Sequence, residues 1–297
     1  MTFSTIQTEF SSNSSDFPIG FSAVPQVIPV VVAPKQKPTV RQLPSLPTLA
    51  SSRVWGIDFS IVNMAQALDY IDAIIQRREP QYAITANANY AMLCEDSSRL
   101  ADFTHRSKLV LCDGMPILWR SRLNEQALPE RVAGADLIFS LAERSAARGH
   151  RIFLMGGSEG VALEAASRLK EIYPNVKIVG AECPPFRRTT VAEHERLCQR
   201  IRDAKPDILL VAFGQPKGEF WIDENYQDLG VPLSIQLGAS FDFITGKAKR
   251  APVWMQKFGL EWLYRTLRDP RRLLPRYSKN AWFLCKTIRN EILEATQ

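Results

Sequence analysis

Short apolar runs alternate with amphipathic stretches along most of the chain. The apolar runs have the length of buried strands and fall at Val54–Phe59, Tyr82–Thr85, Leu109–Cys112, Arg151–Met155, Val176–Ala181, Asp207–Phe213 and Leu233–Leu237. The stretches between them are predicted helices, at Ile61–Gln76, Tyr90–Phe103, Ala135–Arg148, Glu159–Ile172, Val191–Ala204 and Glu219–Asn225. This alternation predicts an α/β fold with a mostly parallel, Rossmann-like sheet and helices on both faces.

The two ends of the chain break the pattern. Residues 1–50 are rich in proline and serine, and we predict a disordered tail there because repeated prolines interrupt helices and strands alike. After Pro252 the chain becomes basic and aromatic, with predicted helices at Trp254–Leu267 and Leu274–Leu293. The prediction is therefore a tail over 1–50, an α/β domain over 51–252 and a helical appendage over 253–297.

Positive charge is concentrated in that appendage. The net charge is +6, and the stretch from Lys247 to Arg289 holds twelve Lys/Arg against two acids, Glu261 and Asp269. Basicity alone is compatible with nucleic acid, an anionic membrane or phosphorylated substrates. A basic helix with aromatic anchors suits an anionic membrane surface, where each Lys/Arg contributes roughly 1 kcal/mol. No nucleic-acid recognition motif is present, so we expect no nucleic-acid partner.

Cysteine and histidine usage argues against a metal site. The five cysteines form no CxxC pair, and the three histidines have no HxxxH spacing. We therefore expect no metal and no cofactor. The sequence also shows no apolar run of bilayer length and no signal-peptide pattern. These features predict a cytoplasmic protein, and the basic appendage favours a peripheral position on a membrane.

Candidate functional residues share one kind of position, directly after predicted strands. They are Thr85, Asn87, Asp113, Gly156, Gly214 and Asp242. Ligands of open parallel sheets bind at the carboxyl ends of the strands. We therefore expect these residues to converge in one cleft, covered by the basic appendage.

Asp113 is the candidate general base. A sugar hydroxyl that attacks an anomeric carbon must lose its proton, and a carboxylate within hydrogen-bond reach can accept it. The alternative is an aspartate that caps the following helix. Arg131 could bind a phosphate with two parallel hydrogen bonds, or form an ordinary surface salt bridge.

The other strand-tip residues allow two interpretations each. Gly156 and Gly157 follow a strand and precede a helix, as in phosphate-binding turns, but they match neither GxGxxG nor a P-loop, and a purely structural turn is as compatible with the pattern. Thr85 and Asn87 could bind sugar hydroxyls or cap a helix. Asp242 could bind a ribose or sugar hydroxyl, or start a helix.

Taken together, the ordered motifs resemble those of the WecG/TagA/CpsF glycosyltransferase family. The resemblance covers about residues 54–285 and includes Thr85-Ala-Asn87, Asp113-Gly114-Met115, Pro129-Glu130-Arg131-Val132, Phe153-Leu-Met-Gly156-Gly157, Gly214-Gln-Pro216-Lys217 and Gly238-Ala-Ser-Phe241-Asp242-Phe243, continuing to Arg250-Ala251-Pro252. It implies inverting, metal-independent transfer of a sugar from a nucleotide donor, usually UDP-linked. The acceptor would be a polyprenyl-diphosphate-linked saccharide at the cytoplasmic membrane face, for wall teichoic acid, capsule or exopolysaccharide.

The resemblance also assigns roles by position. Asp113 matches the proposed base, and Thr85, Asn87 and Arg131 match the active-site pocket. Among the motif residues, Gln215 and Lys217 are candidates for substrate binding, and Gly156, Gly157 and Asp242 for nucleotide binding. The appendage arginines matching a substrate-binding role are Arg265, Arg268, Arg272 and Arg276. One departure is Gly218, which stands where the family commonly has Gln.

Two other functions fit parts of the pattern. The first is a nucleotide-dependent oxidoreductase on a Rossmann-type sheet, and the second is a non-catalytic membrane adaptor that uses only the basic helices. The sequence does not identify the donor sugar, the acceptor glycan, the polymer or the number of subunits.

Overall fold

The computed structural model describes residues 45–185 and 190–296. Within them, six parallel strands form one sheet in the order β4 (Leu109–Cys112), β3 (Gln81–Ala86), β8 (Leu233–Gln236), β7 (Ile208–Ala212), β5 (Arg151–Gly156) and β6 (Lys177–Glu182). The predicted α/β class and parallel sheet are confirmed. The predicted tail falls mainly on residues 1–44, which lie outside the described residues.

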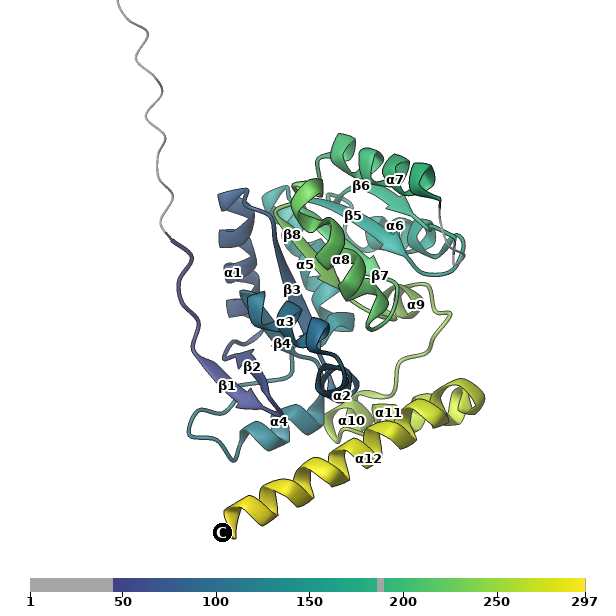
Figure 1. Cartoon of the computed structure of the whole chain (residues 1–297). Helices are drawn as coiled ribbons and strands as arrows, with labels where there is room; N and C mark the ends of the chain where they lie inside the picture. Colours follow the sequence, from purple (N-terminus) through teal and green to yellow (C-terminus); the bar gives the residue numbers. More distant parts are fainter. Residues whose placement is uncertain (1–44, 186–189, 297) are drawn as a thin grey trace, which may run out of the picture. The chain divides into compact units, whose positions relative to one another are not determined.

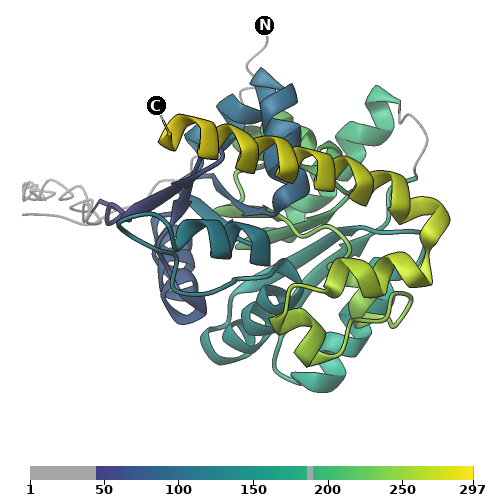
Figure 2. The same ribbon diagram turned by 90° about the horizontal axis from the view of Figure 1, so that it is seen from below.

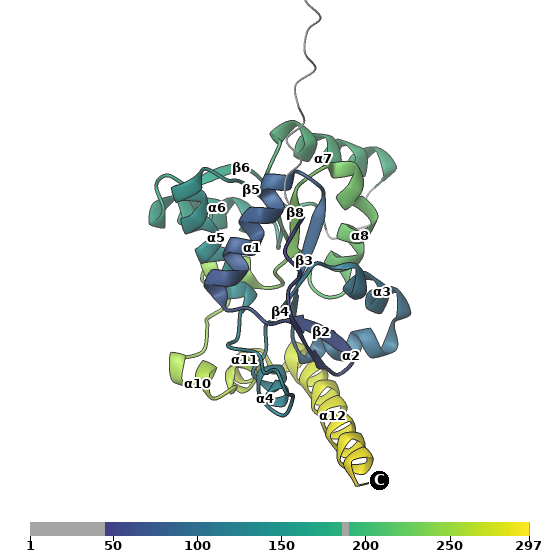
Figure 3. The same ribbon diagram turned by 90° about the vertical axis from the view of Figure 1, so that its left-hand side faces the viewer.

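Two hydrophobic cores sandwich the sheet because neighbouring side chains of a strand point to opposite faces. In β7, for example, Leu210 belongs to one core, and Leu209 and Val211 belong to the other. Figure 3 shows the helices in two layers. The first core is covered by α1 (Met64–Arg77), α5 (Gly134–Arg148), α6 (Val161–Ile172) and α9 (Ser240–Ile244). The second is covered by α2 (Ala88–Asp96), α3 (Ser98–Arg106), α7 (Val191–Ala204) and α8 (Lys217–Leu229).

Some predicted elements have the observed bounds and others are divided. The strand Leu109–Cys112 and the helix Val191–Ala204 were predicted as observed. The predicted strand Val54–Phe59 is instead a hairpin of β1 (Ser51–Val54) and β2 (Ile57–Ser60), because Trp55 and Gly56 both have positive φ and turn the chain. The predicted helix Tyr90–Phe103 is interrupted by Ser97, which is extended and caps α3 through its hydroxyl.

The appendage contains three helices rather than the two predicted. They are α10 (Val253–Lys257), α11 (Glu261–Arg268) and α12 (Pro270–Ala295). The predicted helix Trp254–Leu267 is divided near Gly259, which has positive φ. Figures 1 and 2 show α12 running across one end of the α/β domain.

Both aromatic and ionic contacts attach α12 to the domain. Phe283 packs edge-on against Trp55, with ring centroids 5.6 Å apart, and Glu291 pairs with Arg120 of α4 (Met115–Ser121) at 2.7 Å. In the described part of the chain, no helix combines the length and apolar character needed to cross a bilayer. The contacts of Phe283 and Glu291 hold the appendage as a layer over the ends of the strands.

Candidate active site

A cavity of about 1010 Å³ lies between the strand-end loops and the appendage, and we call it the main cavity. Ten of the thirteen predicted site residues line it: Thr85, Asn87, Asp113, Arg131, Gly157, Gln215, Asp242, Arg265, Arg272 and Arg276. They come from strand tips far apart in the sequence and from two appendage helices. Gly156, Lys217 and Arg268 are not among the lining residues.

Asp113 directly follows β4, and its backbone N–H donates to the carbonyl of Ala86 at 2.8 Å. The helix that follows is capped by Gly114, without a side-chain capping bond, so the capping alternative for Asp113 is wrong. Surrounding protein removes water from the carboxyl and raises its pKa from 3.8 to about 7, with Glu261 adding to the rise. Arg131 and the backbone amide of Gly134 act in the opposite direction.

Arg131 lies inside the main cavity rather than on the outer surface, with 17% of its side chain exposed. Its guanidinium contacts Glu261 Oε2 and Gln256 Oε1, both at 3.3 Å, and Asp136 Oδ2 at 3.7 Å. Asp136 is more tightly bound to Arg250, which donates to both of its carboxylate oxygens. The site therefore holds two arginines next to Asp113, each with an acidic partner.

Thr85 and Asn87 both use part of their hydrogen-bonding capacity within the protein. The Thr85 hydroxyl donates to the Gln236 carbonyl at 3.0 Å, which leaves its oxygen only as an acceptor. Asn87 caps α2 by accepting from the Tyr90 N–H at 3.1 Å, which leaves its side-chain NH₂ as a donor in the main cavity. The capping interpretation holds for Asn87, and the free NH₂ is compatible with sugar binding as well.

The glycine turn after β5 has one residue for packing and one in the cavity. A Cβ on Gly156 would lie 2.7 Å from the carbonyl oxygen of Ala212, so only glycine allows β5 and β7 to approach here. Gly157 and Ser158 line the main cavity near the start of α6. Gly156 can therefore contribute to nucleotide binding only indirectly, by positioning Gly157.

A polar chain connects the appendage to two strand-end loops. Arg276 Nε donates to Asn89 Oδ1 at 3.1 Å, and Asn89 Nδ2 donates to Gln215 Oε1 at 3.0 Å. Burial lowers the pKa of the Arg276 guanidinium, and the nearby Arg265 and Arg272 lower it further. Arg276 stays charged because the intrinsic pKa of arginine is so high. The cavity therefore contains a cation whose described partner is a neutral amide.

The other appendage arginines differ from one another. The Arg265 guanidinium lies 5.3 Å from the ring centroid of Phe243, which also lines the cavity. Arg272 pairs with Asp269 at 2.7 Å. Arg268 is exposed and contacts Tyr264 instead. Among the described residues, neither Arg265 nor Arg276 forms an ion pair, so these two cations are available to an anionic ligand.

Gly218 allows a close approach that a larger residue would prevent. A Cβ at this position would lie 2.3 Å from Cγ of Gln236, whose amide in turn contacts the buried Glu219 at 3.5 Å. Burial raises the pKa of Glu219 to about 7. The Gln236 side chain therefore occupies the space that a Cβ at position 218 would need. Lys217, one residue earlier, is exposed.

Sequence reasoning missed residues that matter for the cavity, namely Asn89, Gln256 and Glu261. Asn89 and Gln256 resemble the other amide side chains of the sequence, and no local pattern distinguishes them. Glu261 did have a signal, because it is one of two acids in the basic stretch from Lys247 to Arg289. Such an isolated acid indicates a specific cationic partner, which here is Arg131.

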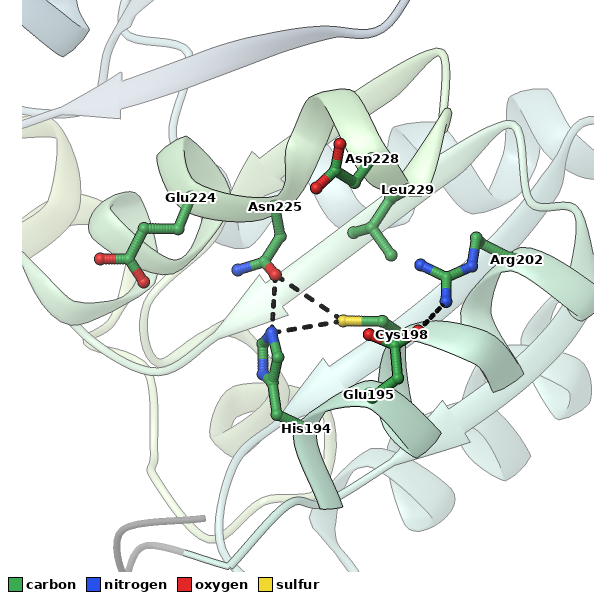
Figure 4. A pocket seen from close by; sticks show the side chains of 8 residues that line it. All are labelled: His194, Glu195, Cys198, Arg202, Glu224, Asn225, Asp228 and Leu229. Atoms are coloured by element: carbon green, nitrogen blue, oxygen red, sulfur yellow. Dashed lines mark hydrogen bonds and ion pairs between the residues drawn. The ribbon is translucent and has the colours of Figure 1, made fainter. Parts of the chain in front are cut away.

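A second hollow of about 330 Å³ lies between α7 and α8 and contains Cys198, His194 and Asn225 (Figure 4). His194 Nε2 is 2.8 Å from Asn225 Oδ1 and 3.5 Å from Cys198 Sγ. Asn225 uses its NH₂ to donate to the Trp221 carbonyl, so Nε2 must carry a proton to donate to Oδ1. The same nitrogen then cannot accept the thiol proton, and burial raises the thiol pKa. This cluster joins two helices and does not activate the cysteine.

Within residues 45–185 and 190–296, no group of three His, Cys, Asp or Glu side chains is placed to hold a metal ion. Two acids in and beside the main cavity are instead paired with arginines, Glu261 with Arg131 and Asp136 with Arg250. In the described site, arginines provide the positive charge near Asp113.

Two relatives named N-acetylglucosaminyldiphosphoundecaprenol N-acetyl-beta-D-mannosaminyltransferase are similar to the chain. The protein from Bacillus subtilis is 31% identical over 226 residues, which is 75% of this chain and 86% of that relative. The protein from Bacillus spizizenii is 28% identical over 217 residues, which is 73% of this chain and 82% of that relative. The sequence profile of the glycosyl transferase WecG/TagA/CpsF family matches residues 52–297, and the chain belongs to this family of glycosyltransferases.

Proposed function

We propose that this glycosyltransferase moves a sugar from a UDP-linked donor to a polyprenyl-diphosphate-linked saccharide, with inversion and without a metal ion. The product would belong to a cell-surface polysaccharide such as an exopolysaccharide, a capsule or a teichoic acid. The observation that supports this best is the main cavity, which is lined by a carboxyl with a pKa of about 7, by Arg131 and by the appendage arginines. The names of the two relatives specify a lipid-diphosphate acceptor of this kind.

In the proposed reaction Asp113 is the base. The acceptor hydroxyl oxygen attacks the anomeric carbon from the side opposite the leaving group, and its proton passes to the Asp113 carboxylate. The bond between the anomeric carbon and the diphosphate oxygen breaks, and UDP leaves with that electron pair. One such displacement inverts the anomeric configuration. A pKa near 7 suits the role because the base is then ionised in part at neutral pH and still accepts a proton readily.

Positive charge supports the departure of the diphosphate. Arg131 lies on the Asp113 side of the cavity, and its planar guanidinium can bind two phosphate oxygens at once. Gly157 and Asp242 would contribute to holding the nucleotide sugar, since both line the same cavity. Fixed positive groups directed at charge that develops in the transition state are a major source of rate enhancement.

The acceptor's diphosphate would be bound from the appendage side. Arg265 and Arg276 line the cavity and, within the described residues, have no carboxylate partner. A lipid-linked diphosphate that enters between the domain and α12 would supply the missing negative charge. Its hydrocarbon chain would remain outside, toward the exposed face of the appendage.

That exposed face suits a membrane surface. Trp254, Phe258, Leu267 and Trp282 are between 57% and 74% exposed, and they lie among the basic residues of α10–α12. Large apolar side chains interleaved with Lys and Arg are typical of helices that lie in an anionic bilayer interface. We therefore propose that the protein acts as a peripheral protein on the inner face of the plasma membrane.

The test is transfer from a panel of UDP-sugars to a short-chain polyprenyl-diphosphate N-acetylglucosamine analogue, with EDTA present. We expect EDTA-resistant transfer, a product of inverted anomeric configuration by NMR, and its loss in Asp113→Asn. Asp102→Asn, an exposed carboxylate outside the cavity, is the matched control. Absence of both UDP binding and transfer would refute the proposal, and near-normal turnover by folded Asp113→Asn would refute the base assignment.

Family membership decides against the two other functions that the sequence allowed. The match to this glycosyltransferase family spans residues 52–297, which favours a sugar transferase over a nucleotide-dependent oxidoreductase or a non-catalytic adaptor.

A further inference from the structure

Glu261 is the acid of α11 that reaches into the main cavity. Its carboxylate is 3.3 Å from the Arg131 guanidinium, and 20% of its side chain is exposed. The contact joins the appendage to a loop 130 residues earlier in the chain. Glu261 therefore places a negative charge on the guanidinium that, in the proposed function, binds the donor's diphosphate.

The geometry of this pair differs from that of its neighbours. Charge-assisted hydrogen bonds between arginine and carboxylate are typically about 2.7–2.9 Å long. Arg250 donates to Asp136 Oδ2 at 2.7 Å, and Arg120 donates to Glu291 at 2.7 Å, so these pairs are tight. Both Arg131–Glu261 and Arg131–Gln256 are longer, at 3.3 Å. Arg131 is thus held by the appendage through longer contacts than those that pair Arg250 and Arg120 with their carboxylates.

We propose that Glu261 is a displaceable counter-ion, which occupies Arg131 until the diphosphate of the nucleotide donor takes its place. This inference rests on the proposed function, because it requires that Arg131 binds the diphosphate. Two anionic groups compete for one guanidinium, so the donor must displace Glu261 from it. Binding of the donor would consequently weaken one of the contacts between α11 and the α/β domain.

Glu261 acts on the base as well as on the arginine. Among the described residues, the charged groups with the largest effect on the pKa of Asp113 are Arg131, Glu261 and Arg250, and Arg276 also interacts with it; of these four, Glu261 is the negative one. Its charge favours the protonated form of Asp113. Removing that charge should therefore make Asp113 ionise at lower pH.

The test compares Glu261→Gln with the unmodified protein by calorimetric titration with UDP and with uridine. Glutamine keeps a hydrogen-bond acceptor near Arg131 and removes the charge. We expect UDP to bind about tenfold more tightly, the order expected when one nearby charge is removed from a partly buried site. Uridine has no diphosphate, so its affinity should stay unchanged. In the transfer assay, the acidic limb of the kcat/KM profile should move to lower pH.

Glu291→Gln is the matched control, since it removes an equivalent contact between the appendage and Arg120 outside the main cavity. It should change neither UDP affinity nor the pH profile. Glu261→Ala carries the same expectation as Glu261→Gln and replaces it if glutamine impairs folding. Equal or weaker UDP binding by these folded variants, beside normal binding by the unmodified protein, overturns the inference alone. Absence of UDP binding by the unmodified protein overturns the proposed function and this inference together.

Discussion

Replacing Asp113 by asparagine should remove activity and at the same time stabilise the folded protein. The side chain keeps its size and loses its charge. In the folded state the carboxyl has a pKa of about 7, raised mainly by burial, against an ordinary value of 3.8. Folding therefore opposes ionisation of this group, and the unmodified protein is destabilised wherever Asp113 would be ionised in the unfolded chain.

The magnitude and the pH range follow from that difference. About three pKa units at roughly 1.4 kcal/mol each give an upper limit of about 4 kcal/mol above pH 7. Because the folded pKa lies above the unfolded one, the penalty is absent below about pH 4, grows between about pH 4 and 7, and is complete above pH 7. For a domain of this size, 4 kcal/mol corresponds to a rise in Tm on the order of 10 °C.

The assay is thermal unfolding of both proteins at pH 4, 5 and 8, with transfer activity measured on the same samples. Asp113→Asn should have a higher Tm at pH 8, a smaller advantage at pH 5 and almost none at pH 4. Its turnover should fall by about 10²- to 10⁴-fold if the carboxylate is the general base. A difference in Tm that does not depend on pH, or a lower Tm at pH 8, would refute the argument that this partly buried carboxyl has a raised pKa.

Three further substitutions test other parts of the structure. Gly156→Ala should lower the free energy of unfolding by roughly 2–4 kcal/mol, since its Cβ would meet the Ala212 carbonyl, and chemical denaturation should show a smaller loss for Gly160→Ala, whose Cβ meets nothing within 4 Å. Arg276→Gln should raise KM for the lipid-linked acceptor about tenfold or more and leave UDP affinity unchanged, and equal effects on both substrates would contradict our placement of the acceptor. Trp282→Ser, at a side chain that is 74% exposed, should weaken sedimentation with anionic vesicles without lowering Tm, and undiminished binding would argue against contact between this face and the membrane.

The sequence predicted the fold class well because short apolar runs, typical of buried strands, alternate with amphipathic stretches that have helical spacing. Two of the predicted helices were wrong because each is divided at one position that the apolar spacing does not mark. Ser97 ends α2 and caps α3, yet the apolar spacing continues across it, so hydrophobic periodicity cannot detect the break. Gly259 divides α10 from α11 in the same way.

The candidate site was predictable as far as it depends on strand ends. Thr85, Asp113 and Asp242 were selected because they follow strands, and the parallel sheet places them on one cavity. The partners that modify them were not predictable, because Glu261 reaches Arg131 only through the packing of α11 on the domain. Lys217 and Arg268 matched motifs or composition, but their places on helices direct them away from the cavity.

One wall of the main cavity is formed by the strand-end loops and the other by the appendage, and this division affects how substrate preference can diverge among related enzymes. The strand-tip loops are fixed by the sheet, whereas α11 and α12 join it through one connection after Ala251. Recombination at this point would exchange the wall that carries Arg265, Arg272 and Arg276 and leave the wall with Asp113 intact. Acceptor preference would then change between related enzymes while the proposed base stays in place, and chimaeras joined there offer a direct way to engineer it.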